Sequence, residues 1–97
     1  MPEAIDTEDG SAPAKWRVLL LNDDHTPMEF VVHLLQQLFD MEHDVAVNLM
    51  LHIHHHGVGE CGVYAEQEAK TKVAAVLALA REHEHPLQCI MEQKRST

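Results

Sequence analysis

Basic side chains are scarce in this sequence of 97 residues. Lysine and arginine number 7 against 16 aspartate and glutamate residues, which gives a formal net charge of −9. Because proteins that bind phosphate backbones rely on clustered lysine and arginine, this shortage argues against a nucleic-acid partner. An acidic surface instead favours cationic ligands, among them a free α-amino group, and keeps a small domain soluble and monomeric.

Cysteines and long apolar runs are also few. Cys61 and Cys89 are the two cysteines, and their spacing matches no metal or disulfide motif, so we expect reduced thiols. The longest uninterrupted apolar run, residues 73–80, is far shorter than the ~20 residues that a membrane span needs. The N-terminus has no basic segment followed by an apolar one. We therefore expect a cytoplasmic protein with no membrane partner.

The length is enough for one modest hydrophobic core. Residues 1–14 hold two prolines, a glycine and four acidic residues but few apolar side chains. Such a segment buries too little surface to offset its ordering entropy. We expect a flexible acidic tail over residues 1–15, either an inert leader or a segment that another protein grips, and a single folded domain over residues 16–97.

Hydrophobic periodicity predicts three strands and three helices in the order strand, helix, helix, strand, helix, strand. Residues 16–21 are almost continuously apolar from Val18, which is typical of a buried central strand. This order predicts a small α+β domain in which a three-stranded antiparallel sheet packs against three helices. The helices are expected over residues 27–39, 44–55 and 66–82, and the other strands over residues 61–65 and 87–91, with a turn at residues 57–60.

The start of the first helix follows directly from the end of the first strand. Residues 22–24, Asn-Asp-Asp, are poor strand formers and stop the strand. Thr26 is then expected to cap the helix, with Pro27 at its first position and Glu29 reaching back in a capping box. Gly57 is expected to end the second helix in the left-handed conformation.

Histidine is frequent, with 9 residues, and a group of them ends the second predicted helix. His52 and His56 lie four residues apart and could share a metal ion, since imidazole is a good zinc ligand. No nearby cysteine or acidic residue supplies further ligands at a recognisable spacing, and histidines also suit the negative end of a helix. A histidine-rich metal-binding or metal-sensing domain is therefore the alternative function.

Catalysis has weak support in the sequence. Cys61 could pair with a histidine, but nothing in the sequence positions a base and an orienting group beside it. We expect no enzyme and no cofactor. A polar lip of Asn22, Asp24 and one histidine around an apolar hollow is a better candidate for a site, although ordinary core packing also explains the apolar residues, which are Met28, Val31, Met50, Ile53 and Leu87.

These residues resemble the ClpS family, the adaptors that deliver N-degron substrates to the Clp protease. The resemblance is dense from residue 16 to residue 92, does not cover the tail, and is most specific over the run from Asn22 to Val31. It implies a fold like that of the C-terminal domain of ribosomal protein L7/L12. It also implies recognition of proteins whose first residue is leucine, phenylalanine, tyrosine or tryptophan. The matching segments are residues 18–32, 50–54, 61–64 and 85–89, with Gly57, Lys72 and Val73.

The resemblance also implies a role for each site residue. Asn22, Asp24 and His54 would contact the α-amino group of the substrate, and Thr26 would lie near the next peptide bond. The side chain of the first residue would be surrounded by Met28, Val31, Met50, Ile53 and Leu87.

Three departures from the family pattern affect these roles. His25 stands where tyrosine is frequent, which would change contacts beyond the first residue. Gln67 and Lys70 replace two acids on the third helix, while Lys72 is kept; family members dock on the ClpA unfoldase through this face. Ile53 replaces a frequent valine, and its extra methylene would narrow the pocket against bulky rings.

Overall fold

The computed structural model describes residues 14–94. The expected tail, residues 1–15, lies almost wholly outside the described residues, and Lys15 is already the first residue of a strand. None of the helices in the described part is long and apolar enough to cross a membrane.

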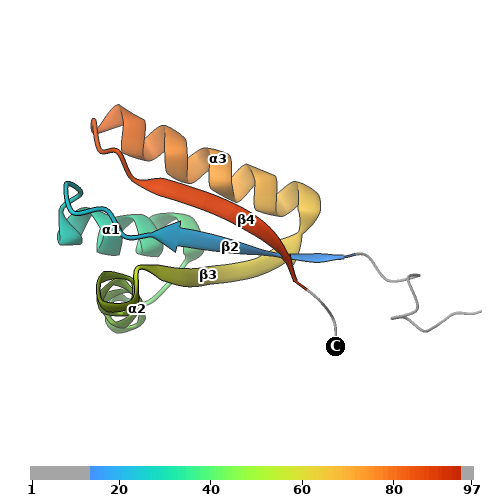
Figure 1. Cartoon of the computed structure of the whole chain (residues 1–97), viewed down its shortest axis with the longest axis horizontal. Helices are drawn as coiled ribbons and strands as arrows, with labels where there is room; N and C mark the ends of the chain where they lie inside the picture. The colour runs from blue at the N-terminus through green and yellow to red at the C-terminus, as the bar shows by residue number, and fades with distance from the viewer. Residues whose placement is uncertain (1–13, 95–97) are drawn as a thin grey trace, which may run out of the picture.

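The described residues form one antiparallel sheet of three strands in the order β3-β2-β4 (Figure 1). Strand β2 spans Lys15–Leu21, β3 spans Val58–Ala65 and β4 spans Gln88–Lys94. The apolar strand is therefore central, as its sequence predicts. The last residue of β2, Leu21, pairs with Val58 on one side and Gln88 on the other, so one end of the sheet brings three distant segments together.

Three helices complete the domain: α1 at Met28–Phe39, α2 at His43–His56 and α3 at Glu66–Glu82. Val18 and Leu20 of β2 are fully buried in the core that the helices cover, together with Leu34 and Leu35 of α1. The α+β architecture with three helices on a three-stranded sheet is thus confirmed.

The second strand is longer than predicted. The expected turn at residues 57–60 was wrong because only Gly57, at φ +90°, has the left-handed conformation that a glycine favours. Residues 58–60 pair with residues 19–21 of β2 instead. The ladder then shifts between Val18 and Leu19, which leaves Cys61 as the extra residue of a β-bulge.

The start of α1 also differs from the prediction. Pro27, in an extended conformation, is the N-cap, and no side chain caps the helix, so Thr26 does not form the expected capping box with Glu29. The hydroxyl of Thr26 donates to the Asp23 carboxylate at 2.7 Å, and the Thr26 backbone N–H donates to the Asp23 carbonyl oxygen at 3.1 Å. The Thr26 hydroxyl therefore bonds to the nearby Asp23 carboxylate and not to the end of the helix. This bond stabilises the turn before α1.

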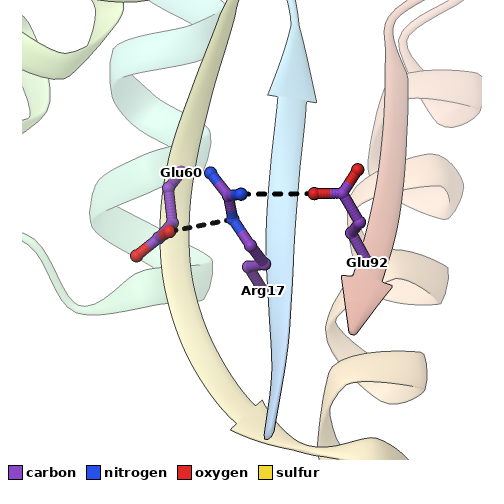
Figure 2. Close-up of polar contacts among 3 residues, drawn as sticks. All are labelled: Arg17, Glu60 and Glu92. Carbon is purple, nitrogen blue, oxygen red and sulfur yellow. Dashed lines mark hydrogen bonds and ion pairs between the residues drawn. The ribbon is translucent and has the colours of Figure 1, made fainter. Parts of the chain in front are cut away.

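Charged side chains occupy the face of the sheet that the helices leave open. Figure 2 shows Arg17 of β2 reaching Glu60 of β3 at 3.1 Å and Glu92 of β4 at 3.2 Å. All three side chains are partly exposed, so each pair stabilises the sheet by about 1 kcal/mol or less. The cross-strand placement nevertheless matches the register, since Arg17 stands directly opposite Glu92.

Candidate functional site

A cavity of about 250 Å³ opens at the end of β2, between α1, α2 and the segment before β4. All nine residues that the resemblance placed around a ligand line this single cavity, although they come from three separate segments of the chain, residues 22–31, residues 50–54 and residue 87. They are Asn22, Asp24, Thr26, Met28, Val31, Met50, Ile53, His54 and Leu87.

Further residues line the cavity that the sequence reasoning did not include. Leu20 and Leu21 form its wall at the end of β2, and Asp23 and Pro27 belong to the turn. Their closeness to Asn22 in the sequence was the available signal, but the apolar run that contains Leu20 and Leu21 indicated only a buried central strand. Leu20 is fully buried in the core and also lines the cavity.

The inner part of the cavity is apolar and formed by core residues. Val31, Met50, Ile53 and Leu87 are all buried and belong to the hydrophobic core of the domain. Met28 differs because 46% of its surface is exposed, which places it at the mouth of the cavity. An unbranched thioether at the mouth can adjust its rotamer to different occupants.

The polar residues lie at the rim, where Asn22, Asp24 and His54 are all exposed. The Asn22 side-chain amide donates to the Asp24 carboxylate at 3.2 Å, which orients both groups. With its N–H₂ group turned to Asp24, Asn22 keeps its carbonyl oxygen available as an acceptor. The rim thus offers a carboxylate, an amide oxygen and an imidazole beside an apolar hollow.

The rim is built where β2 and α2 end. His54 lies in the last turn of α2, and the Gly57 N–H closes that helix on the carbonyl oxygen of Ile53 at 2.8 Å. The Asn22 backbone N–H then donates to the Gly57 carbonyl oxygen at 2.9 Å. This bond fastens Asn22 to the negative end of α2, so the helix dipole adds to the attraction for a cation.

The neighbouring acid, Asp23, has a different role from Asp24. Its carboxylate accepts the hydroxyl of Thr26, whose surface is only 7% exposed. Asp23 also lines the cavity, while its carboxylate stabilises the turn before α1.

The other histidines do not assemble a metal centre in the described residues. The rings of His52 and His56 face each other on α2 with centroids 4.4 Å apart. No group of three or more histidine, cysteine or acidic side chains in residues 14–94 is arranged to hold a metal ion. Because zinc sites in proteins use three or four protein ligands, this pair alone does not make one.

The cysteines are unsuited to nucleophilic chemistry. Both are free and buried, Cys61 on β3 and Cys89 on β4. Desolvation by burial, with a smaller contribution from Cys89 and Glu60, raises the pKa of Cys61 to about 12. Burial likewise raises the pKa of Cys89 to about 12. Since the thiolate is the reactive form, thiols held neutral are poor nucleophiles.

The two residues expected to contact a partner lie on α3, away from the cavity lining. Gln67 is exposed near the start of the helix. Lys72 is partly buried and donates to the carbonyl oxygen of Leu38 in α1.

Comparison with known proteins gives a consistent set of relatives. The family model described as ATP-dependent Clp protease adaptor protein ClpS matches residues 11–90. The chain is 58% identical over 82 residues to the ATP-dependent Clp protease adapter protein ClpS 2 of Rhodopseudomonas palustris, an alignment that covers 84% of this chain and 75% of that protein. It is 60% identical over 82 residues to the ClpS adapter of Brucella canis, covering 84% of this chain and 71% of that protein.

A solved structure shares the fold. The structure of Agrobacterium tumefaciens ClpS2 bound to L-phenylalaninamide matches with a TM-score of 0.84 and 34% sequence identity, covering 86% of this chain and 100% of that chain. The family model spans most of the sequence, and relatives of high identity share the cavity-bearing domain. The chain therefore belongs to the ClpS family of ATP-dependent Clp protease adaptor proteins.

Proposed function

We propose that this adaptor binds the free α-amino group and the bulky hydrophobic first residue of an N-degron protein, and delivers that protein to a ClpA-type unfoldase of the Clp protease. The first residue would be leucine, phenylalanine, tyrosine or tryptophan. One observation carries the proposal: three exposed polar acceptors stand at the rim of a cavity with a buried apolar floor. Phenylalaninamide, the ligand of the Agrobacterium tumefaciens structure, carries an amine and an apolar ring in this same relation.

The rim suits an α-ammonium group. An ammonium has three N–H donors and no acceptor, and the Asp24 carboxylate, the Asn22 carbonyl oxygen and a neutral His54 imidazole supply three acceptors. Only Asp24 carries a full charge, so it contributes the strongest bond. Hydrogen bonds to charged groups contribute about 1.5–3 kcal/mol each.

The floor suits one apolar side chain. A volume of about 250 Å³ lies below the roughly 300–1,000 Å³ typical of drug-sized ligands, so the cavity fits a single residue. Burying a leucine or phenylalanine side chain contributes about 1.5–3 kcal/mol. Against an association cost of about 4 kcal/mol or more, the upper end of these contributions corresponds to binding in the micromolar range.

Delivery requires a second surface, which we place on the exposed face of α3 around Gln67 and Lys72. This face is separate from the cavity lining, so a substrate and an unfoldase can be held at the same time. The adaptor needs no chemistry of its own in this scheme, because the unfoldase unfolds the substrate and the Clp protease cleaves it.

A pair of peptides tests the amine-binding part of the proposal. A peptide that begins with phenylalanine is labelled at its C-terminal end, and its binding is measured by fluorescence anisotropy in the presence of EDTA. We expect micromolar binding, and at least a 100-fold loss of affinity when the same peptide is N-acetylated, because acetylation removes the ammonium. Equal affinity of the two peptides would refute the proposal, and binding that vanishes with EDTA would favour the metal-binding alternative.

A further inference from the structure

A buried glycine lies directly behind the cavity. Gly59 of β3 pairs with Leu20 of β2, and Leu20 lines the cavity. A methyl group placed on Gly59 would lie 2.5 Å from Cγ1 of Ile53 and 3.0 Å from Cδ1 of Leu49. Contacts of 2.5 Å between carbon atoms are forbidden by their van der Waals radii, so α2 packs on β3 in this way only because residue 59 has no side chain.

The longer arm of Ile53 fills the space that Gly59 leaves. Its Cγ1 lies nearest to the position of the missing methyl group, and its Cδ1 lies 3.3 Å from that position. Ile53 is only 3% exposed and forms part of the cavity floor. The ethyl arm of Ile53 therefore packs against β3 at the position of Gly59.

We propose that Gly59 is a positioning residue that sets the width of the cavity through Ile53. The inference rests on the proposed function and extends it to substrate class: the Gly59–Ile53 pair keeps the floor wide enough for aromatic first residues as well as leucine. The width of the floor depends on both residues, because the side chain of Ile53 occupies the space that the missing side chain of Gly59 leaves free.

The substitution Gly59→Ala makes the coupling measurable. The three atoms nearest to the new methyl group belong to side chains of α2, two to Ile53 and one to Leu49. Gly59 is buried, and Cγ1 of Ile53 is the nearest atom at 2.5 Å, so Ile53 is the side chain that must move most. Its way out is toward the unfilled cavity. A shift by about one methylene in an apolar pocket changes discrimination about 10-fold or more, and wide rings are affected most.

The test measures affinities of three peptides that differ only in their first residue: leucine, phenylalanine or tryptophan. Four proteins are compared: the unsubstituted protein, the single variants Gly59→Ala and Ile53→Val, and the double variant that carries both substitutions. For Gly59→Ala we expect the phenylalanine and tryptophan peptides to lose at least 10-fold relative to the leucine peptide. The double variant is expected to recover the selectivity of the unsubstituted protein. Valine lacks Cδ1, so turning its γ carbon away from the new methyl group carries no further carbon into the cavity.

Gly62→Ala is the matched control on the same strand. A methyl group there would lie 2.5 Å from the hydroxyl oxygen of Tyr64 and 2.7 Å from the nearest ring carbon, and neither residue lines the cavity. This control is expected to lower stability without changing the ratios between peptides. A similar change of ratios in Gly62→Ala would show that any packing defect in β3 alters selectivity, and would overturn the assignment to Gly59.

The inference is also overturned if Gly59→Ala weakens all three peptides equally, or if Ile53→Val does not restore the ratios. Should Gly59→Ala fail to fold by circular dichroism, Ile53→Val is compared with the double variant instead. Equal ratios in these two support the inference, and loss of the aromatic peptides in the double variant refutes it. Failure of the proposed function is distinct, since the full chain would then bind free and acetylated peptides alike.

Discussion

The ε-amino group of Lys72 on α3 lies 2.6 Å from the carbonyl oxygen of Leu38 near the end of α1. The same ammonium lies 5.5 Å from the centroid of the Phe39 ring and 5.8 Å from that of Tyr64. The last carbonyl groups of a helix have no hydrogen-bond partner within the helix and carry its negative end, so the partly buried ammonium of Lys72 supplies both a donor and a compensating charge. Lys72 therefore ties α1 to α3, besides its expected place on the docking face.

Replacing this lysine should lower stability measurably. We expect Lys72→Met to reduce the free energy of unfolding by about 1.5–3 kcal/mol, since a charge-assisted hydrogen bond is lost while the aliphatic stem is kept. The measurement is urea denaturation followed by circular dichroism. Lys70→Met is the control, because Lys70 pairs with Glu66 at 3.8 Å on the exposed face of the same helix. That change should cost about 0.5 kcal/mol or less; equal losses at both positions would contradict the tie to Leu38.

The two adjacent aspartates should separate binding from stability. Asp24→Asn removes the charge at the rim, so we expect the affinity for a phenylalanine-initiated peptide to fall about 10- to 100-fold with little change in unfolding free energy. Asp23→Asn weakens the bond to the Thr26 hydroxyl and is expected to lower stability by about 1 kcal/mol with a smaller effect on affinity. Anisotropy and urea denaturation on both variants check this, and equal affinity losses would show that Asp24 is not the amine acceptor.

Gly57 should be sensitive through its backbone alone. Its φ of +90° is unfavourable for other residues, yet a Cβ there would meet no atom within 4 Å. We expect Gly57→Ala to lower the unfolding free energy by about 1–2 kcal/mol. Gly57→Asn should cost less, since asparagine tolerates the left-handed region. If the two variants are equally stable in thermal melts, the left-handed conformation of Gly57 does not explain the loss of stability.

The buried thiols predict a specific pH dependence. The pKa of each thiol is about 12 in the folded protein against 9.0 for an ordinary thiol. Above pH 9 the unfolded chain releases these protons while the folded chain keeps them, so unfolding is favoured increasingly as the pH rises from 9 to 12. Below pH 9 the thiols are protonated in both states, so the folded state keeps its full stability relative to the unfolded state.

Two measurements check this prediction. At pH 8 iodoacetamide should leave Cys61 and Cys89 unmodified in the folded protein and alkylate both in urea. The loss of unfolding free energy between pH 9 and pH 11 should be smaller in a variant with alanine at both positions, which separates the thiols from lysine and tyrosine titration. Rapid alkylation of the folded protein would contradict the assigned burial.

Local signals in the sequence predicted the elements that depend on short-range chemistry. The apolar spacing of residues 66–82 matches α3 at both ends, and Gly57 ends α2 as expected. Where two local signals competed, the prediction failed. Glycines at positions 57 and 59 indicated a turn, but pairing with the buried strand β2 decided the conformation of residues 58–60. Similarly, Thr26 had both a helix end and Asp23 within reach, and the sequence does not rank the two.

The sequence by itself determined a small acidic α+β domain, its central strand and, through the family pattern, the residues around one cavity. Tertiary structure decided which residues distant in the sequence come into contact. Lys72 meets Leu38, 34 residues earlier, and Ile53 meets Gly59 across two elements. Such contacts depend on how helices settle on the sheet, because close packing is set by the shapes of side chains distant in the chain. Periodicity identifies the face on which a residue lies, whereas only the packed fold determines what that face touches.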